Sequence, residues 1–351
     1  MSSEGGLSTK DSGIAVTVWD AAYLYPVLQD SHGRKISYLR LGVTDRCNLR
    51  CRYCMPAEGI NFSDKSELLT FEEILFLGRV LRKMGVVKVR LTGGEPLVRR
   101  GLPELVHELG QIFPTLAMTT NGVLLPPVLD TLIESGLTRY NLSLDTLRPD
   151  RFAAITRRDD FTGTMAALDA LLERGVTTKI NVVVLKGTND DELVDFVALT
   201  KDRQLDVRFI EAMPFNDDDG NHHLFLPYHE MLDRLRASYP ELTQIQGEKN
   251  SSSITYQVPG FRGNVGLIPA YSRSLCGSCN RLRLTPKGTM LNCLYSTKGL
   301  ELRPLLRGGI SEDELEQLIT DFVATKEIDG FVTERKEQQG GVFASMTSIG
   351  G

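Results

Sequence analysis

The sequence lacks the features of a membrane or nucleic-acid-binding surface. It has no run of about eighteen apolar residues, and its N-terminus has no basic segment followed by an apolar core. Trp19 is the only tryptophan, and 45 acidic residues outnumber 40 basic ones, which gives a formal net charge of −5. Because this balance attracts no polyanion overall, any anion site must be a local cluster. We expect a cytoplasmic protein that binds neither DNA nor a membrane.

Cysteine is also scarce, and its distribution is uneven. The six cysteines form two triads, Cys47, Cys51 and Cys54 in "CNLRCRYC" and Cys276, Cys279 and Cys293 in "CGSCNRLRLTPKGTMLNC". In a reducing compartment such clusters are metal ligands or reactive thiols more often than disulfides. The spacing leaves two kinds of site open. A zinc site would need a fourth ligand for each triad, whereas an iron–sulfur cubane held by three thiolates keeps one iron open for another ligand.

Short apolar runs alternate with helical patterns over the first two thirds of the chain. The candidate strands are residues 38–44, 87–93, 115–120, 139–144, 179–185 and 205–210. The helical patterns cover residues 70–85, 101–112, 126–135, 161–174 and 190–203, and the first opens with the capping pair Thr70 and Glu73. This alternation predicts a parallel sheet with ligand residues at the carboxyl ends of its strands. Since the alternation ends after residue 215, we predict an α/β fold, an open (β/α)6 partial TIM barrel.

Basic residues lie within these apolar strands. Residues two apart on a strand share a face, so Lys88 and Arg90 project together, and Arg40, Lys179 and Arg208 lie on other strands. A single basic residue on a strand is often solvated or paired. Five of them predict a cationic lumen, which suits phosphate groups.

The second cysteine triad lies in a candidate hairpin. Arg281 and Arg283 share one face of a strand after Cys279, and a turn at residues 286–288 returns the chain to Cys293. A helix capped by Ser311 is predicted over residues 311–326. We therefore divide the chain into an extension expected to be mobile (1–35), the barrel (36–215) and a C-terminal region with the second triad and the Gly350–Gly351 tail (216–351).

The first triad carries a resemblance to a known superfamily. Its C-x3-C-x2-C spacing, with Tyr53 before the last cysteine and "LTGGEP" at residues 91–96, resembles the signature of the radical S-adenosylmethionine (SAM) superfamily. The resemblance implies a 4Fe–4S cluster whose open iron binds SAM, and a fold of the radical SAM type. The residues that it places at SAM are Tyr53, Gly94, Ser143 and Met213.

The second triad makes the resemblance more specific. Its C-x2-C-x13-C spacing, followed by the Asn280–Arg283 run after a six-unit barrel, resembles the GTP 3′,8-cyclase family of molybdenum-cofactor biosynthesis over about residues 36–351. The resemblance implies an auxiliary 4Fe–4S cluster, catalytic roles for Cys47, Cys51, Cys54 and Arg40, and a tail that enters the active site. The residues implied to bind GTP are Arg40, Lys88, Arg90, Thr119, Lys179, Arg208, Arg281 and Arg283.

This family resemblance also implies a reaction and partners. A 5′-deoxyadenosyl radical formed from SAM would abstract the ribose 3′ hydrogen of GTP, and the carbon radical would add to guanine C8. One-electron reduction and protonation would then give 3′,8-cyclo-7,8-dihydro-GTP. Expected partners are a flavodoxin- or ferredoxin-like electron donor, a downstream cyclic pyranopterin monophosphate synthase and a second copy of the chain. Two alternatives stay open: a peptide-modifying radical SAM enzyme, whose SAM cleavage would ignore GTP, and a non-catalytic protein stabilised by zinc.

Overall fold

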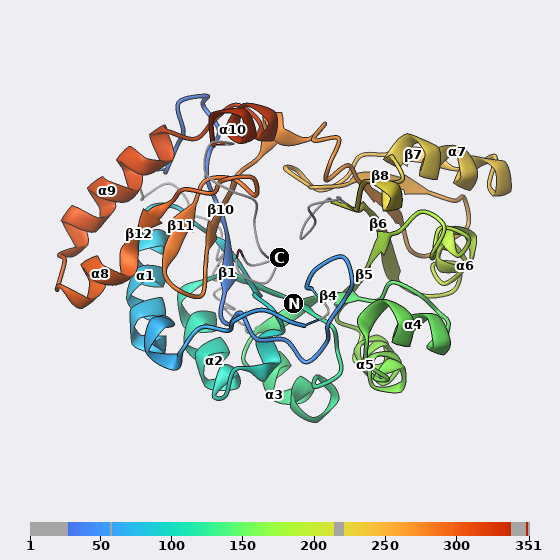
Figure 1. The fold of residues 1–351 in the computed structure, drawn as a ribbon, viewed down its shortest axis with the longest axis horizontal. Helices are drawn as coiled ribbons and strands as arrows, with labels where there is room; N and C mark the ends of the chain where they lie inside the picture. Colours follow the sequence, from blue (N-terminus) through green and yellow to red (C-terminus); the bar gives the residue numbers. More distant parts are fainter. Residues whose placement is uncertain (1–26, 57, 214–220, 338–348, 350–351) are drawn as a thin grey trace, which may run out of the picture.

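The computed structural model describes residues 27–56, 58–213, 221–337 and 349 (Figure 1). Its strands form one curved twelve-stranded sheet, in the order β12-β11-β10-β1-β2-β3-β4-β5-β6-β9-β8-β7. The end strands of this order, β12 and β7, are not paired with each other, so hydrogen bonds do not close the sheet in the described part of the chain. The predicted open α/β barrel is confirmed.

Six consecutive parallel strands form the centre of the sheet. They are β1 (Tyr38–Gly42), β2 (Lys88–Thr92), β3 (Thr115–Thr120), β4 (Leu137–Ser143), β5 (Thr177–Val184) and β6 (Leu205–Glu211). Each pairs in parallel with the next. The sequence located all six because parallel strands covered on both faces have continuous apolar runs that stand out from the helical segments between them.

Helices cover the outer side of these strands (Figure 1). They are α1 (Phe71–Lys83), α2 (Leu102–Ile112), α3 (Leu129–Glu134), α4 (Pro149–Thr156), α5 (Phe161–Glu173) and α6 (Leu193–Ala198). The predicted capping pair of α1 is confirmed: Glu73 N donates to Thr70 Oγ1 at 3.2 Å, and Thr70 N donates to Glu73 Oε2 at 2.7 Å. Buried leucines of these helices pack on the sheet and form one continuous core.

The prediction for α6 was too long at both ends, since the helix ends at Ala198 rather than near residue 203. The helix begins at Leu193 rather than near residue 190. Asn189 explains the difference, because its side chain accepts a hydrogen bond from Leu185 N at 2.7 Å and donates to Asp145 O at 2.6 Å. These bonds hold a turn where the sequence predicted the first helical turn.

Two hairpins from the C-terminal region extend the sheet at both edges. At one edge β10 (Arg281–Leu284) pairs in parallel with β1 and continues into the antiparallel strands β11 (Thr289–Leu291) and β12 (Leu300–Glu301). At the other, β9 (Val265–Ile268) pairs in parallel with β6, followed by β8 (Ile254–Gln257) and β7 (Thr243–Ile245). The predicted hairpin between Cys279 and Cys293 is thus confirmed.

The remaining helices flank these edge hairpins. They are α7 (Tyr228–Ser238), α8 (Leu302–Arg307), α9 (Glu312–Ala324) and α10 (Gly330–Glu337). The predicted cap of α9 is present, with Glu314 N donating to Ser311 Oγ at 3.3 Å. Within the described residues, no helix is both long enough and apolar enough to cross a membrane.

The segment before β1 packs on the barrel from residue 27 onward. Leu28 N donates to Met84 O at 2.9 Å, and Gln29 forms an isolated bridge with Lys35. Arg34 Nη1 donates to the carbonyl oxygen of Cys276 at 3.2 Å. This segment therefore braces the loop that carries the second cysteine triad.

Candidate active site

The first cysteine triad lies in the loop that follows β1, at the carboxyl end of that strand. Cys47, Cys51 and Cys54 are free thiols and partly exposed. The loop is wound on itself, since Cys54 N donates to Cys51 O at 3.0 Å and Leu49 N donates to Cys47 Sγ at 3.4 Å. Burial raises the pKa of Cys47 to about 11 and raises that of Cys51 well above its ordinary value. Both thiols are thus neutral near pH 7 unless a metal ion deprotonates them.

The glycine segment after β2 runs directly against this loop. Gly94 N donates to Thr44 O and Glu95 N donates to Arg46 O, both at 2.8 Å. A Cβ atom on Gly94 would lie 2.3 Å from Arg46 O. Only glycine fits this approach of two backbones.

Replacing Gly94 with alanine is expected to separate these two loops. We expect a loss of about 1–3 kcal/mol of stability from overpacking, together with weaker SAM binding, measured by thermal denaturation and equilibrium binding. Gly163→Ala is the matched control. Gly163 lies inside α5, where an added Cβ atom would make ordinary contacts of 3.6 Å with Val123. SAM binding by Gly94→Ala equal to that of the control would contradict this assignment.

Two buried carboxylates brace the carboxyl ends of the strands. Glu95 accepts hydrogen bonds from Thr120 Oγ1 at 2.8 Å and Asn121 N at 2.7 Å, and burial raises its pKa to about 7. Asp145 accepts from Tyr53 OH and from Val183 N, both at 2.8 Å. Tyr53 is thereby fixed between the cysteine loop and the ends of β4 and β5.

The other residues predicted at SAM lie at or just beyond the carboxyl ends of β4 and β6. Ser143 ends β4, and its register partner on β5 is Asn181. Asn181 Oδ1 is buried and has no hydrogen-bond partner among the described residues, which fits a polar ligand at this position. Met213 follows β6 and packs with Leu291 and Ile349.

The second triad lies at the other end of the strands. Cys276 and Cys279 precede β10, and Cys293 follows β11, so this triad is at the amino end of β10. Since β1 and β10 are parallel neighbours, the two triads lie at opposite ends of this strand pair. Although burial opposes it, the charges of Lys326 and Arg281 lower the pKa of Cys279.

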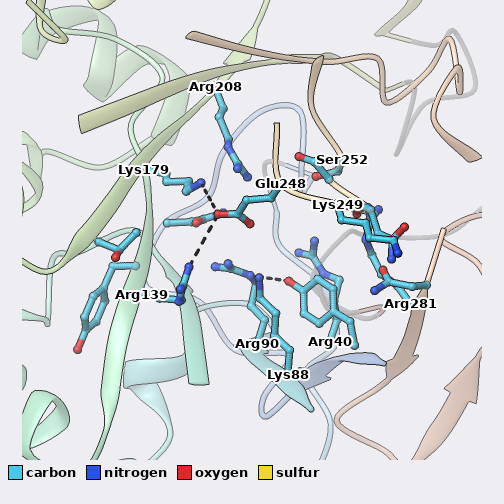
Figure 2. Close-up of a pocket in the computed structure, with 17 residues that line it drawn as sticks. Arg40, Lys88, Arg90, Arg139, Lys179, Arg208, Glu248, Lys249, Ser252 and Arg281 are labelled. Atoms are coloured by element: carbon cyan, nitrogen blue, oxygen red, sulfur yellow. Dashed lines mark hydrogen bonds and ion pairs between the residues drawn. The ribbon is translucent and has the colours of Figure 1, made fainter. Parts of the chain in front are cut away.

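A pocket of about 760 Å³, counting the solvent at its mouth, opens along the inner face of strands β1, β2, β4, β5, β6 and β10. Figure 2 shows basic side chains pointing into it from several strands. Its lining includes eight basic side chains, Arg40, Lys88, Arg90, Arg139, Lys179, Arg208, Lys249 and Arg281. The structure therefore brings together six of the eight residues predicted to bind GTP.

The other two predicted residues contact this set without lining the pocket. Arg90 Nη1 donates to Thr119 Oγ1 at 3.4 Å. Arg283 faces Arg40 across the β1–β10 pair, and its Nη1 donates to Ile349 O at 3.5 Å. Gly350 and Gly351 lie outside the described residues.

The pocket holds more positive than negative charge. Burial and the neighbouring Arg283 lower the pKa of Arg40 to about 9, and Arg40 Nε has no hydrogen-bond partner among the described residues. Burial would raise the pKa of Tyr38, but Arg90, Arg40 and Lys88 lower it to about 7. Lys179 differs, because it pairs with Asp206 at 3.0 Å. This excess charge fits a polyanionic ligand.

Two family models together match most of the chain. The radical SAM superfamily model matches residues 41–200, and the model "Molybdenum Cofactor Synthesis C" matches residues 205–331. The GTP 3′,8-cyclase of Chlorobaculum tepidum is 40% identical over 93% of this chain and 97% of its own length. The chain belongs to the GTP 3′,8-cyclase family.

Other relatives agree with this family membership. The GTP 3′,8-cyclase of Moorella thermoacetica is 39% identical over 92% of this chain and 100% of its own length. Molybdenum cofactor biosynthesis protein 1 of Bos taurus is 45% identical over 92% of this chain, which spans 50% of that protein. The chain thus spans about half the length of the longer animal relatives that it matches.

Solved structures support the fold alone. SuiB of Streptococcus suis bound to S-adenosylmethionine aligns with a TM-score of 0.53 at 16% identity, covering 85% of this chain and 68% of SuiB. Family membership confirms the predicted cofactor classes, iron–sulfur clusters and SAM. The donor set fits them, because each triad offers three free thiols. Among the described residues, no three Cys, His, Asp or Glu side chains are grouped so that they could hold a single metal ion.

The pocket differs from the sequence prediction in its position and in part of its lining. Its strand residues lie in the amino-terminal and middle parts of the strands, such as Tyr38 on β1 and Arg139 on β4, not at the carboxyl ends. The six-unit barrel of this cyclase family member is open, so its inner face is accessible there as well. Sequence reasoning missed Tyr38 and Arg139, which strand periodicity could have found. It also missed the 248–252 segment between β8 and β7, where no periodic signal exists.

Proposed function

We propose that this chain is the enzyme that converts GTP to (8S)-3′,8-cyclo-7,8-dihydroguanosine 5′-triphosphate, the first step of molybdenum-cofactor biosynthesis. One observation carries the proposal: eight basic side chains converge in a pocket on the sheet whose β1–β10 strand pair has a cysteine triad at each end. A substrate with a triphosphate at one end suits the cations. The family membership supports guanosine as the remainder of this substrate.

The binding residues divide by position. The triphosphate contacts five pocket cations, Lys88, Arg90, Lys179, Arg208 and Arg281. The other three residues, Arg40, Thr119 and Arg283, contact the rest of the GTP molecule. Arg40 is proposed as catalytic because its buried Nε atom has no partner among the described residues and is free to orient a substrate oxygen. The tail residues Gly350 and Gly351 complete this part of the site, in line with the contact of Arg283 with Ile349.

The triads hold the cofactors. Cys47, Cys51 and Cys54 bind one 4Fe–4S cluster beside SAM, which Tyr53, Gly94, Ser143 and Met213 contact, and Cys276, Cys279 and Cys293 bind the second. When bound, these groups would supply the electron and the radical chemistry that the reaction needs. The chain holds the ribose near SAM, keeps guanine C8 within reach of C3′ and excludes water from both.

Further parts of the proposal concern organisation and partners. A flavodoxin- or ferredoxin-like protein supplies electrons, cyclic pyranopterin monophosphate synthase receives the product, and two chains form a homodimer in the cytoplasm. The barrel spans residues 36–215, with an N-terminal extension before it and the second-cluster region after it.

The reaction is tested with the anaerobically reconstituted protein. We expect SAM, a reductant and GTP to give 5′-deoxyadenosine and a cyclised guanosine product, both detected by mass spectrometry, and ATP to give no cyclised product. SAM cleavage that GTP neither stimulates nor diverts would favour the peptide-modifying alternative. Zinc in place of iron, with no SAM cleavage, would favour the non-catalytic one.

A further inference from the structure

One carboxylate lies among the eight basic side chains of the pocket. Among the described residues that line the pocket, Glu248 is the only Asp or Glu, and Figure 2 shows its side chain extending into the space between the cations. Its Oε1 atom accepts a hydrogen bond from Lys179 Nζ at 3.4 Å and lies 3.8 Å from Arg139 Nη1. Although burial opposes it, the charges of Lys179, Lys88 and Arg208 lower the pKa of this carboxyl. Glu248 is therefore one negative charge that several of these cations share, in addition to Asp206, which pairs with Lys179 at 3.0 Å.

The carboxylate and the cations belong to different parts of the fold. Lys88, Arg139, Lys179 and Arg208 lie on the parallel strands β2, β4, β5 and β6. Glu248 lies in the segment between β7 and β8, two short antiparallel strands at the edge of the sheet. A turn closed by Ser251 N donating to Glu248 O at 3.0 Å holds this segment, and Arg281 Nη2 donates to Asn250 O at 2.9 Å. The Glu248 side chain is 55% exposed, so it can leave the pocket by rotating its own side-chain bonds.

We propose that Glu248 is a resident anion that a polyphosphate displaces from the pocket, and that it thereby sets how tightly the pocket binds a polyanion. The inference rests on the proposed function, in which these cations take the triphosphate of GTP. Without a ligand, Glu248 offsets part of the repulsion among the strand cations. An entering triphosphate takes over Lys179 and Arg139, and the carboxylate turns toward solvent. A ligand that reaches few of these cations gains too little binding free energy to displace the Glu248 carboxylate.

The test compares Glu248→Gln with the unaltered protein, both carrying their clusters. Glutamine keeps the shape and removes the charge. We expect Glu248→Gln to bind both GTP and inorganic tripolyphosphate about fivefold more tightly, the sum of a few exposed ion pairs, and to bind guanosine no more tightly. Glu241→Gln is the matched control, since Glu241 is exposed, lies before β7 and does not line the pocket. Isothermal titration calorimetry under anaerobic conditions gives all three affinities.

Each other outcome has a definite meaning. Equal affinities in Glu248→Gln and Glu241→Gln would overturn the inference, because Glu248 would then be a solvated neighbour. Weaker GTP binding by Glu248→Gln would also overturn it and would make Glu248 a residue that helps to hold the ligand. Tripolyphosphate binding without GTP binding by the unaltered protein would refute the proposed function, while the effect of Glu248→Gln on tripolyphosphate would still decide the inference. Binding of neither ligand would refute both.

Discussion

The Cys51→Ala variant is expected to cleave no SAM. Cys51 is the central thiol of the first triad, and it lies close enough to Cys47 and Cys54 for their charges to act on its pKa. Loss of a residue that only supports a metal ligand lowers metal affinity or activity by roughly 10- to 100-fold. Loss of one of the three thiolate ligands should lower activity by more than that. We therefore expect 5′-deoxyadenosine formation to fall by more than about 100-fold, measured with dithionite as reductant.

Cys293→Ala is the matched comparison for Cys51→Ala. Cys293 belongs to the second triad, at the opposite end of the β1–β10 pair. Its loss should leave SAM cleavage measurable while the cyclised guanosine product disappears. If Cys293→Ala retained full cyclisation activity, the second triad would have no part in handling GTP. If both variants lost SAM cleavage equally, the two triads would not have separate roles.

The Arg90→Ala variant is expected to lose GTP binding while it keeps SAM binding. Arg90 is 7% exposed, and its guanidinium is already oriented, with Nε donating to Tyr38 OH at 2.7 Å and Nη1 to Met118 O at 2.9 Å. A charge-assisted hydrogen bond contributes about 1.5–3 kcal/mol, so the Kd for GTP should rise about 10- to 100-fold. Calorimetric titration with GTP and, separately, with SAM measures both affinities.

Two controls accompany the Arg90 measurement. Arg100→Ala removes the same charge at an exposed position outside the pocket and should change GTP binding little. Arg90→Lys should lie between the two, because an ammonium group keeps the charge and loses the planar fork. Equal losses of GTP and SAM affinity in Arg90→Ala would indicate a general folding defect and would remove the support for a phosphate contact.

The sequence predicted the parts of the structure that depend on local pattern. Strand periodicity placed Lys88 and Arg90 on one face, and both line the pocket. The Thr70 and Ser311 caps and the hairpin after Cys279 follow from short motifs and are all present. These features are predictable because their cause lies within a few residues of sequence.

What depends on pairing between distant segments was not predictable. Nothing near residue 281 shows that β10 joins β1, a contact between residues more than 240 positions apart. The same is true of Glu248, which is in a polar segment without periodicity and reaches Lys179 only through the pairing of β8 with β9. The residues near these positions in the sequence therefore give no local signal for either contact.

The central claim is that the pocket holds the ribose of GTP where its 3′ hydrogen can be removed. The most direct measurement is label transfer from GTP deuterated at C3′, with the reconstituted protein, SAM and a reductant, followed by mass spectrometry of 5′-deoxyadenosine. We predict one deuterium in the 5′-deoxyadenosine formed, and none when the deuterium is placed at C2′ of GTP. Unlabelled 5′-deoxyadenosine formed at full rate from the 3′-deuterated substrate would contradict the claim.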